Sequence, residues 1–224
     1  MSHPAWPSMV WQIYSWDYET FGSFYGCRKA CEPIHIQKNL DDQKVVVVNT
    51  SLKEIKGAKV VYEVYSLEGK SLFKRTTSLN VLANGLTECF VQDKPASVSG
   101  VYMERLVLQD KRGKVISTND YWQDNGEGNF QGFNALEEAS INCKLIRQKE
   151  NQIQIELQNT GAMPALALKL NAREADTDKR ILPAYASDGY FNLLPGEKRT
   201  VTVEYVSRGK VAISAEGYNF KRSR

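Results

Sequence analysis

Apolar side chains recur at every second position over most of the chain from residue 34 onward, and this spacing is typical of strands with one buried face. The clearest case is NQIQIELQN (151–159), where Ile153, Ile155 and Leu157 alternate with polar residues. The same alternation predicts the inward residues of two further strands: Leu166, Leu168 and Leu170 in 165–172, and Val201, Val203 and Tyr205 in 199–206. The pattern favours an all-β chain over a helical one.

Turn residues separate these runs at the spacing expected of antiparallel sheets. The run KVVVVNTSL (44–52) is typical of a central strand. Two β-rich stretches are each interrupted by residues that favour a hairpin turn, at Glu68-Gly69-Lys70 and at 110–113. The predicted strands of this part are two runs within 58–76, two within 99–122 and two weaker ones within 78–92, and a last strand at 210–220 closes the set. Short strands with such turns indicate immunoglobulin-like β-sandwiches.

The stretch QDNGEGNFQGFNAL (123–136) divides the strands into two groups. It holds three glycines and three asparagines, a composition that suits a connection better than a strand. We therefore expect two tandem sandwiches, 31–125 and 136–224, joined by a linker at 126–135. We find no obvious internal repeat, so the two sandwiches are expected to share architecture only.

The first thirty residues differ from the rest. Eight of the 23 aromatic residues lie between Trp6 and Tyr25. Residues 8–14 are predicted to form a buried strand, and 21–31 a short helix that enters the first sandwich and ends before Pro33. One strand and one helix make a single unit of a β/α repeat, and a solitary parallel strand has no neighbour to pair with. This part of the sequence therefore resembles a truncated larger domain.

Charge and cysteine content exclude several classes of function. The net charge of +3 is spread along the chain, which gives no electrostatic case for nucleic acid or an anionic membrane. No apolar stretch is long enough to span a bilayer, and no signal peptide is visible. The four cysteines form no CxxC pair and are expected to be free and buried, and His3 and His35 are the only histidines. We expect no metal and no cofactor.

Two stretches resemble one known family. PSMVWQIYSWDYETFGSFYGCRKACEPIHIQ (7–37) is similar to the exit from the catalytic (β/α)8 barrel of family 2 glycoside hydrolases, in the β-mannosidase and exo-β-glucosaminidase branch. The match includes Tyr25-Gly26 and the run from Lys29 to Gln37. ILPAYASDGYFNLLPGEKRTVTVEY (181–205) is similar to the last sandwich of the same branch. The resemblance covers essentially the whole chain and implies that 1–30 is a barrel-end remnant.

The resemblance also implies what the chain lacks. Members of this branch are retaining glycosidases whose general acid and nucleophile are glutamates on earlier barrel strands, and no segment here corresponds to those strands. Retaining hydrolysis needs two carboxyl groups about 5–5.5 Å apart on one scaffold. We therefore expect no catalytic residue, no activity of the chain alone, and carbohydrate and the catalytic barrel of the same polypeptide as partners. The resemblance further implies a periplasmic or secreted protein.

Five residues are candidates for substrate contact in an intact enzyme: Trp11, Trp16, Asp17, Tyr18 and Asp188. Active sites of such barrels lie at the carboxyl ends of the strands, where WQIYSWDY places its aromatic residues. A tryptophan face can pack on a sugar ring, and a neighbouring carboxylate can accept hydrogen bonds from hydroxyls. The alternative is aromatic packing between barrel and sandwich. For Asp188, which precedes Gly189, the alternative is a turn-forming role.

Two other functions remain open at this point. The chain could be a stand-alone carbohydrate-binding module, for which Trp122 beside Tyr121 is one possible aromatic cluster and the group Tyr185, Tyr190 and Phe191 is another. Most of these rings are expected to lie in the sandwich cores. The chain could also be a cell-surface β-sandwich interaction protein, which would explain the strands but not the aromatic opening.

Overall fold

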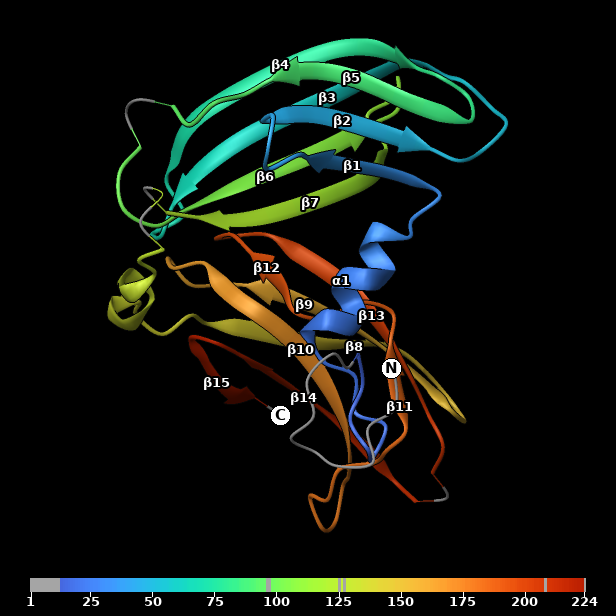
Figure 1. The fold of residues 1–224 in the computed structure, drawn as a ribbon. Helices are drawn as coiled ribbons and strands as arrows, with labels where there is room; N and C mark the ends of the chain where they lie inside the picture. Colours follow the sequence, from blue (N-terminus) through green and yellow to red (C-terminus); the bar gives the residue numbers. More distant parts are fainter. Residues whose placement is uncertain (1–12, 96–97, 125, 127, 208, 224) are drawn as a thin grey trace. The chain divides into compact units, whose positions relative to one another are not determined.

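The chain folds as two β-sandwich units in the computed structural model, which describes residues 13–95, 98–124, 126, 128–207 and 209–223 (Figure 1). One unit, the first sandwich, is Lys29–Leu136. The other, the second sandwich, consists of Glu137 onward together with the described residues up to Arg28. The fold class is all-β, as the alternation predicts. Residues 13–28, called the opening segment below, pack with the second sandwich.

The first sandwich is built from two antiparallel sheets. Its elements are β1 (Ile34–Lys38), β2 (Lys44–Asn49), β3 (Ile55–Ser66), β4 (Ser71–Val81), β5 (Gly85–Val91), β6 (Tyr102–Gln109), β7 (Val115–Gln123) and the short 3-10 helix η1 (Gln131–Ala135). The strand order is β1-β2-β5 in one sheet and β4-β3-β6-β7 in the other. The predicted strand pair in 78–92 is wrong in one respect, because β4 continues to Val81 and only β5 is separate.

The core of this sandwich follows from alternation. Its fully buried members are Ile36, Val45, Val47, Ala58, Val60, Tyr62, Val64, Val81, Leu106 and Leu108. Burying each of the larger side chains contributes roughly 1.5–3 kcal/mol. The hairpin turns are made as their residues predict: Gly69 and Gly113 both have positive φ, and Asp110 accepts hydrogen bonds from the backbone of Arg112 and Lys114.

A buried ion pair joins the two sheets of the first sandwich. Lys38 Nζ on β1 lies 2.8 Å and 3.0 Å from the carboxylate oxygens of Glu104 on β6. The Tyr62 hydroxyl on β3 donates to the same carboxylate over 2.9 Å. Glu104 and Tyr62 have no solvent exposure. Burial, followed by the charge of Glu104, raises the pKa of Tyr62, so its hydroxyl remains a donor.

The second sandwich has the same two-sheet construction. Its elements are α1 (Gly22–Ala30), whose last two residues belong to the first unit, and β8 (Ile141–Lys149), β9 (Gln152–Asn159), β10 (Ala165–Glu174), β11 (Ala184–Ala186), β12 (Phe191–Leu193), β13 (Lys198–Tyr205), β14 (Val211–Gly217) and β15 (Phe220–Ser223). The sheets run β12-β10-β14-β15 and β11-β13-β9-β8. The predicted last strand, 210–220, contains β14, and a turn leads from it to a further strand, β15, which pairs with β14.

The predicted inward faces of the second sandwich are confirmed with one exception. Ile153, Ile155 and Leu157 on β9 lie in the core, as do Val201, Val203 and Tyr205 on β13. On β10, Leu168 and Leu170 join this core, but Leu166 does not, although it is buried. Ala167 has a φ of 52°, and the register against β12 shifts between Ala165 and Leu168. This bulge changes the phase of the alternation.

A polar corner occurs once in each sandwich and was missed by sequence reasoning. Asn49 and Asn159, both with no solvent exposure, end β2 and β9. The Asn49 amide donates to the carbonyls of Lys53 and Leu82, and the Asn159 amide donates to those of Met163 and Leu193. Each is followed by a threonine. The backbone N–H of Thr50 donates to the carbonyl of Pro33, and that of Thr160 donates to the carbonyl of Ser140. The two sandwiches therefore share a short Asn-Thr repeat as well as an architecture.

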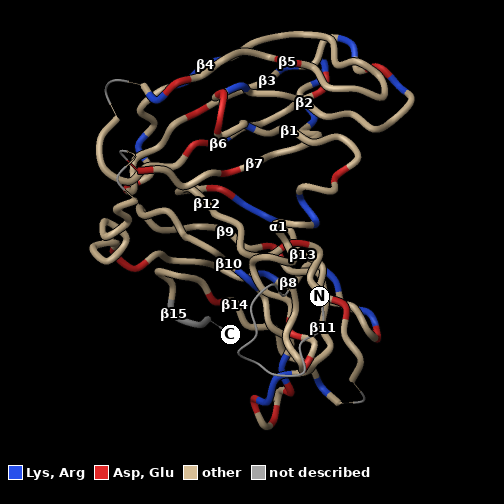
Figure 2. The backbone as a smooth tube through the Cα atoms, viewed as in Figure 1, with Lys and Arg blue, Asp and Glu red and all other residues tan. Residues whose placement is uncertain are grey.

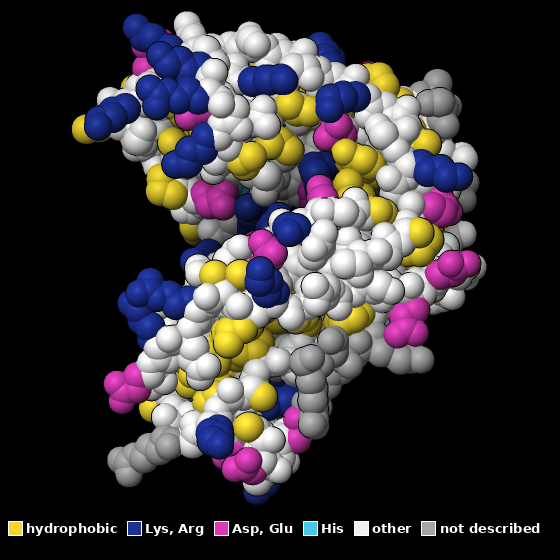
Figure 3. Space-filling model, turned by 180° about the vertical axis from the view of Figure 1, so that it is seen from behind, with side chains coloured by type: hydrophobic (Ala, Val, Ile, Leu, Met, Phe, Trp, Pro, Cys, Tyr) yellow, Lys and Arg dark blue, Asp and Glu magenta, His cyan; other side chains and the backbone are white. Residues whose placement is uncertain are grey.

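The remaining expectations on the surface are met in part. All four cysteines are free, but Cys27 and Cys31 are exposed, so their predicted burial is wrong; α1 has no buried residue. Lys, Arg, Asp and Glu are interspersed along both units (Figure 2). On the face drawn in Figure 3, hydrophobic side chains form patches between charged ones. Among the described residues, none of the helices has the length and apolar character that crossing a membrane requires.

Candidate functional site

Three of the five candidate substrate residues lie in one tight turn. The backbone N–H of Ser15 donates to the carbonyl of Glu19 over 2.9 Å, and that of Tyr18 donates to the carbonyl of Ser15 over 3.0 Å. Trp16 is 55% exposed and Tyr18 48% exposed at the tip of this turn. The fourth candidate, Trp11, and most of the predicted strand 8–14 lie outside the described residues.

Asp17 holds the turn together. Its carboxylate accepts a hydrogen bond from the Ser15 hydroxyl and another, of 3.3 Å, from the backbone N–H of Glu19. Tyr18 has a φ of 68° and its ring stacks on that of Tyr14, with 6.2 Å between the ring centroids. Both exposed aromatic rings therefore project from a turn whose backbone is fixed by local hydrogen bonds.

Glu19 fastens the turn to the second sandwich. Its carboxylate lies 3.0 Å from Lys169 Nζ on β10 and also pairs with Arg180, and Lys169 makes a further ion pair of 2.9 Å with Glu216 on β14. Burial by itself would raise the pKa of Glu19, but hydrogen bonds from Arg180 and Lys169 outweigh burial and lower it. Lys169 and Arg180 lie 150 and 161 residues from Glu19 in the sequence, so the local sequence pattern does not reveal this anchor.

Helix α1 is docked on the second sandwich through Tyr25. The ring of Tyr25 covers Gly189 so closely that a β-carbon added there would lie 2.8 Å from ring atoms. The Tyr25 hydroxyl is 3.0 Å from the Thr20 hydroxyl, and its ring lies against Tyr190 with 5.9 Å between centroids. Burial is the main cause that raises the pKa of Tyr25. The two stretches that resemble one family, 7–37 and 181–205, thus meet at Tyr25 and Gly189.

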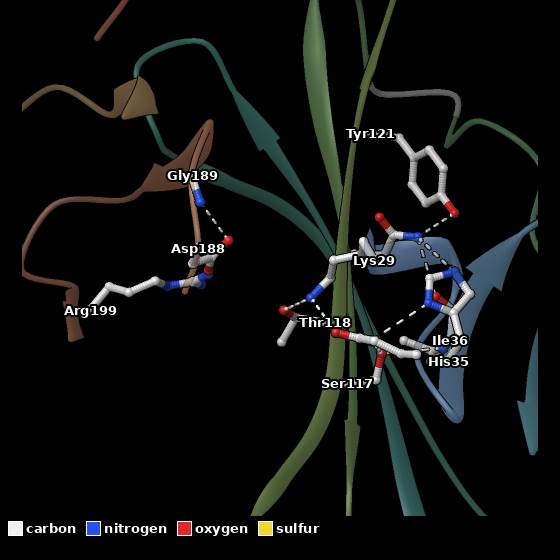
Figure 4. Close-up of polar contacts among 11 residues, drawn as sticks. Lys29, His35, Ile36, Ser117, Thr118, Tyr121, Asp188, Gly189 and Arg199 are labelled. Atoms are coloured by element: carbon white, nitrogen blue, oxygen red, sulfur yellow. Dashed lines mark hydrogen bonds and ion pairs between the residues drawn. The ribbon is translucent and has the colours of Figure 1, made fainter. Parts of the chain in front are cut away.

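Asp188 is engaged within its own sandwich (Figure 4). One carboxylate oxygen accepts from the backbone N–H of Gly189 over 2.9 Å, and the other lies 2.5 Å from a guanidinium nitrogen of Arg199. Arg199 also lies over the ring of Phe191, 4.8 Å from its centroid. These contacts fix the loop that receives Tyr25, so Asp188 positions the binding surface for α1.

The second half of the first matching stretch is anchored in the first sandwich (Figure 4). Glu32 lies 3.1 Å from Lys29 Nζ, and it accepts a 2.7 Å hydrogen bond from Ser117 on β7. Ser117 in turn accepts from the backbone N–H of Ile36 over 3.3 Å. His35 is buried beside Glu32, and burial is the largest cause of its lowered pKa. The residues from Lys29 to Ile36 therefore carry structural contacts.

A small cavity lies under the opening segment. Its volume is about 20 Å³, and its lining includes Glu19, Tyr25, Lys169 and Arg180. This volume has room for about one water molecule and is far too small for a sugar ring. Within the described ranges, no group of three or more His, Cys, Asp or Glu side chains is arranged to hold a metal ion. The residues around this cavity therefore serve to pack and position the opening segment.

The aromatic clusters considered for sugar binding are separated by the fold. Phe191 is buried in the core of the second sandwich, and Tyr190 packs on Tyr25, whereas Tyr185 is 47% exposed. Trp122 packs edge-on against Phe133 with 5.1 Å between centroids. Among these rings, the exposed one is Tyr185, which lies on β11.

Two family models match the chain in the same order as its sandwiches. The model described as the mannosidase Ig/CBM-like domain matches residues 41–125. The model described as the exo-β-D-glucosaminidase Ig-fold domain matches residues 119–220. Its start at 119 falls within β7.

Curated relatives align with nearly the whole chain. Exo-β-D-glucosaminidases from Arthroderma benhamiae and Amycolatopsis orientalis are 25% and 27% identical to it, over 99% and 98% of its length. Mannosylglycoprotein endo-β-mannosidase from Lilium longiflorum is 22% identical over 96%. The chain spans only 27%, 24% and 30% of these three proteins, respectively. It therefore corresponds to one part of a larger glycosidase.

A solved structure shows the same fold. The crystal structure of the exo-chitosanase CsxA from Amycolatopsis orientalis matches 99% of this chain with a TM-score of 0.87 at 25% identity, and the match covers 30% of that chain. The class is thus a tandem of immunoglobulin-like C-terminal domains of a glycoside hydrolase. The chain belongs to family 2 glycoside hydrolases, in the branch of the exo-β-D-glucosaminidases and β-mannosidases.

Proposed function

We propose that the two sandwiches support the catalytic barrel of an exo-β-glucosaminidase- or β-mannosidase-like enzyme and hydrolyse nothing by themselves. In this proposal residues 1–30 form the end of the barrel, 31–125 and 136–224 are the sandwiches, and 126–135 joins them. The observation that carries it is the opening segment: Glu19 and Tyr25 fix it to the second sandwich, while Trp16 and Tyr18 stay exposed. Exposed, immobilised aromatic rings suit a surface that another domain covers.

The same proposal gives the candidate residues a place in the intact enzyme. Trp11, Trp16, Asp17 and Tyr18 would line the substrate side of the barrel's last loop, and Asp188 would position the loop that holds α1. The printed names of the relatives make β-glucosaminides and β-mannosides the substrate classes to test. Carbohydrate and the barrel are then the partners of this chain.

Incubation of the purified chain with p-nitrophenyl β-glucosaminide and β-mannoside is the direct test. We expect no release of nitrophenol, because the two carboxyl groups that retaining hydrolysis needs must be held on one scaffold. Release in proportion to the protein concentration, with the activity following the chain through a second chromatographic step that removes contaminants, would reject the proposal. In an enzyme that joins the chain to its barrel, Trp16→Ala is expected to raise KM several-fold; an unchanged KM would remove Trp16 from the substrate wall.

A further inference from the structure

A groove at one end of the second sandwich has the chemistry of a carbohydrate subsite. Its volume is about 500 Å³, which lies within the range of small-molecule sites. Its lining comes from the turn between β8 and β9, the start of β11 and the end of β13, and includes Glu150, Pro183, Tyr185, Glu204 and Val206. All of these belong to one compact unit, so the groove does not depend on a neighbouring domain.

Strand register places the groove's functional groups in one row. Tyr185 on β11 pairs with Glu204 on β13, Glu204 pairs with Gln152 on β9, and Gln152 pairs with Lys149 on β8. Paired residues of adjacent strands share a face. This is the outer face, because the alternating neighbours Ile153 and Tyr205 lie in the core. An aromatic ring, a carboxylate, an amide and an ammonium group therefore follow one another across the sheet.

Hydrogen bonds hold the residues of this row in place. The backbone N–H of Tyr205 donates to the carbonyl of Asn151 over 3.1 Å, which ties the β8–β9 turn to the end of β13. The Gln152 amide donates to one Glu204 oxygen over 3.1 Å. Tyr185 remains 47% exposed, and Val206, which also lines the groove, is 77% exposed. An exposed tyrosine with an adjoining apolar side chain offers a flat surface for the C–H face of a sugar ring.

The charges of the groove favour a cationic sugar. The lining of the groove holds two carboxylates, Glu150 and Glu204, and one ammonium group, Lys149, so its formal charge is negative. The chain as a whole carries a net charge of +3. A neutral sugar gains no attraction from this excess of carboxylate, whereas the ammonium group of an amino sugar forms charge-assisted hydrogen bonds with it. We propose that this groove is a non-catalytic binding site for an oligosaccharide of β-linked amino sugars, with Tyr185 stacking on one ring and Glu204 receiving its ammonium group. The choice of ligand rests on the proposed function.

Isothermal titration calorimetry of the chain tests this site. The probes are the tetramer of β-1,4-linked glucosamine and its fully N-acetylated counterpart, each at low and at 0.3 M salt. We expect saturable heat with the amino tetramer, at least tenfold weaker binding of the N-acetylated one, and weakening of the former by salt. Flat traces with both tetramers, or equal affinities, would overturn the proposal.

Variants then locate the site. Tyr185→Ala is expected to weaken binding of the amino tetramer at least tenfold and Tyr185→Phe to leave it within twofold, because the ring and not the hydroxyl carries the stacking. Glu204→Gln should weaken only the amino tetramer. Tyr218→Ala, which removes another exposed tyrosine of the same sandwich, is the matched control. Unchanged binding by folded Tyr185→Ala would place any binding elsewhere. Absence of binding leaves the scaffold proposal standing, and hydrolysis by the chain would reject that proposal whatever the calorimetry shows.

Discussion

The contact between Tyr25 and Gly189 depends on the absence of a side chain. Gly189 is needed for space, because the ring of Tyr25 occupies the volume that a β-carbon would take. Asp188 and Arg199 fix the backbone on one side of this contact, and the Thr20 hydroxyl holds the Tyr25 hydroxyl on the other. A loop whose sequence suggested only a turn is therefore the receptor surface for the helix.

Replacing Gly189 by alanine should destabilise the second sandwich by roughly 1–3 kcal/mol, the usual range for overpacking a close contact. Urea denaturation measures the free energy of unfolding. The matched control is Gly26→Ala in α1, where an added β-carbon meets nothing within 4 Å. Since glycine weakens a helix interior, that variant should gain about 0.5–1 kcal/mol in the isolated chain. Equal effects of both substitutions would show that the Tyr25 contact is unimportant.

At the scale of elements, the alternation of side chains identified most of the strands correctly. It could not reveal the bulge at Ala167, because the leucines of ALALKLNA alternate without a break in the sequence, although the backbone changes phase between Ala165 and Leu168. It also could not place α1, because Gly189 and Tyr190, which Tyr25 of this helix contacts, are more than 150 residues away in the sequence. Glu19 follows Asp17 by two residues, and nothing in the local sequence indicates that it pairs with Lys169 and Arg180. Local pattern predicts elements, whereas long-range contacts must be seen in space.

The attachment of the opening segment should depend on pH through Glu19. Its pKa is lowered from the ordinary 4.5, so the folded state binds the proton less readily than the unfolded chain. The stabilisation is therefore present above about pH 4.5 and is lost as the pH falls through the lowered pKa. Because Glu19 is partly exposed and screened by solvent, we expect an effect on the order of 1 kcal/mol.

Urea denaturation of the wild-type chain and Glu19→Gln from pH 7 to pH 3 measures this contribution. The difference in unfolding free energy should be largest at neutral pH and should shrink steadily below pH 4.5. Glu88→Gln, which removes the more exposed ion pair with Lys44, is the control and should change little at any pH. A Glu19→Gln difference that is constant across the range would contradict the linkage.

At the scale of the whole molecule, each unit has its own core and its own polar contacts. The Lys38–Glu104 pair lies entirely within the first sandwich. Removal of one partner of a buried ion pair leaves the other charge without compensation and costs about 3–5 kcal/mol. Lys38→Met should therefore lower the unfolding temperature of the first sandwich and leave that of the second unchanged.

Differential scanning calorimetry of the wild-type chain, Lys38→Met and Gly189→Ala separates the two units. We expect two transitions, one moved by each substitution. The double variant Lys38→Met/Glu104→Leu should recover part of the loss, because no buried charge remains, although the buried Tyr62 hydroxyl loses its acceptor. A single transition shifted by both substitutions would mean that the sandwiches unfold together.

The opening segment is next to the first sandwich in the sequence but is attached to the second sandwich in the structure. Residues 13–28 come before the first sandwich, yet Glu19 and Tyr25 secure them to the second. The first sandwich is in this sense an insertion between two pieces of a discontinuous domain. A protease cut in the connection after β7 would therefore leave the two fragments associated through noncovalent contacts between the opening segment and the second sandwich.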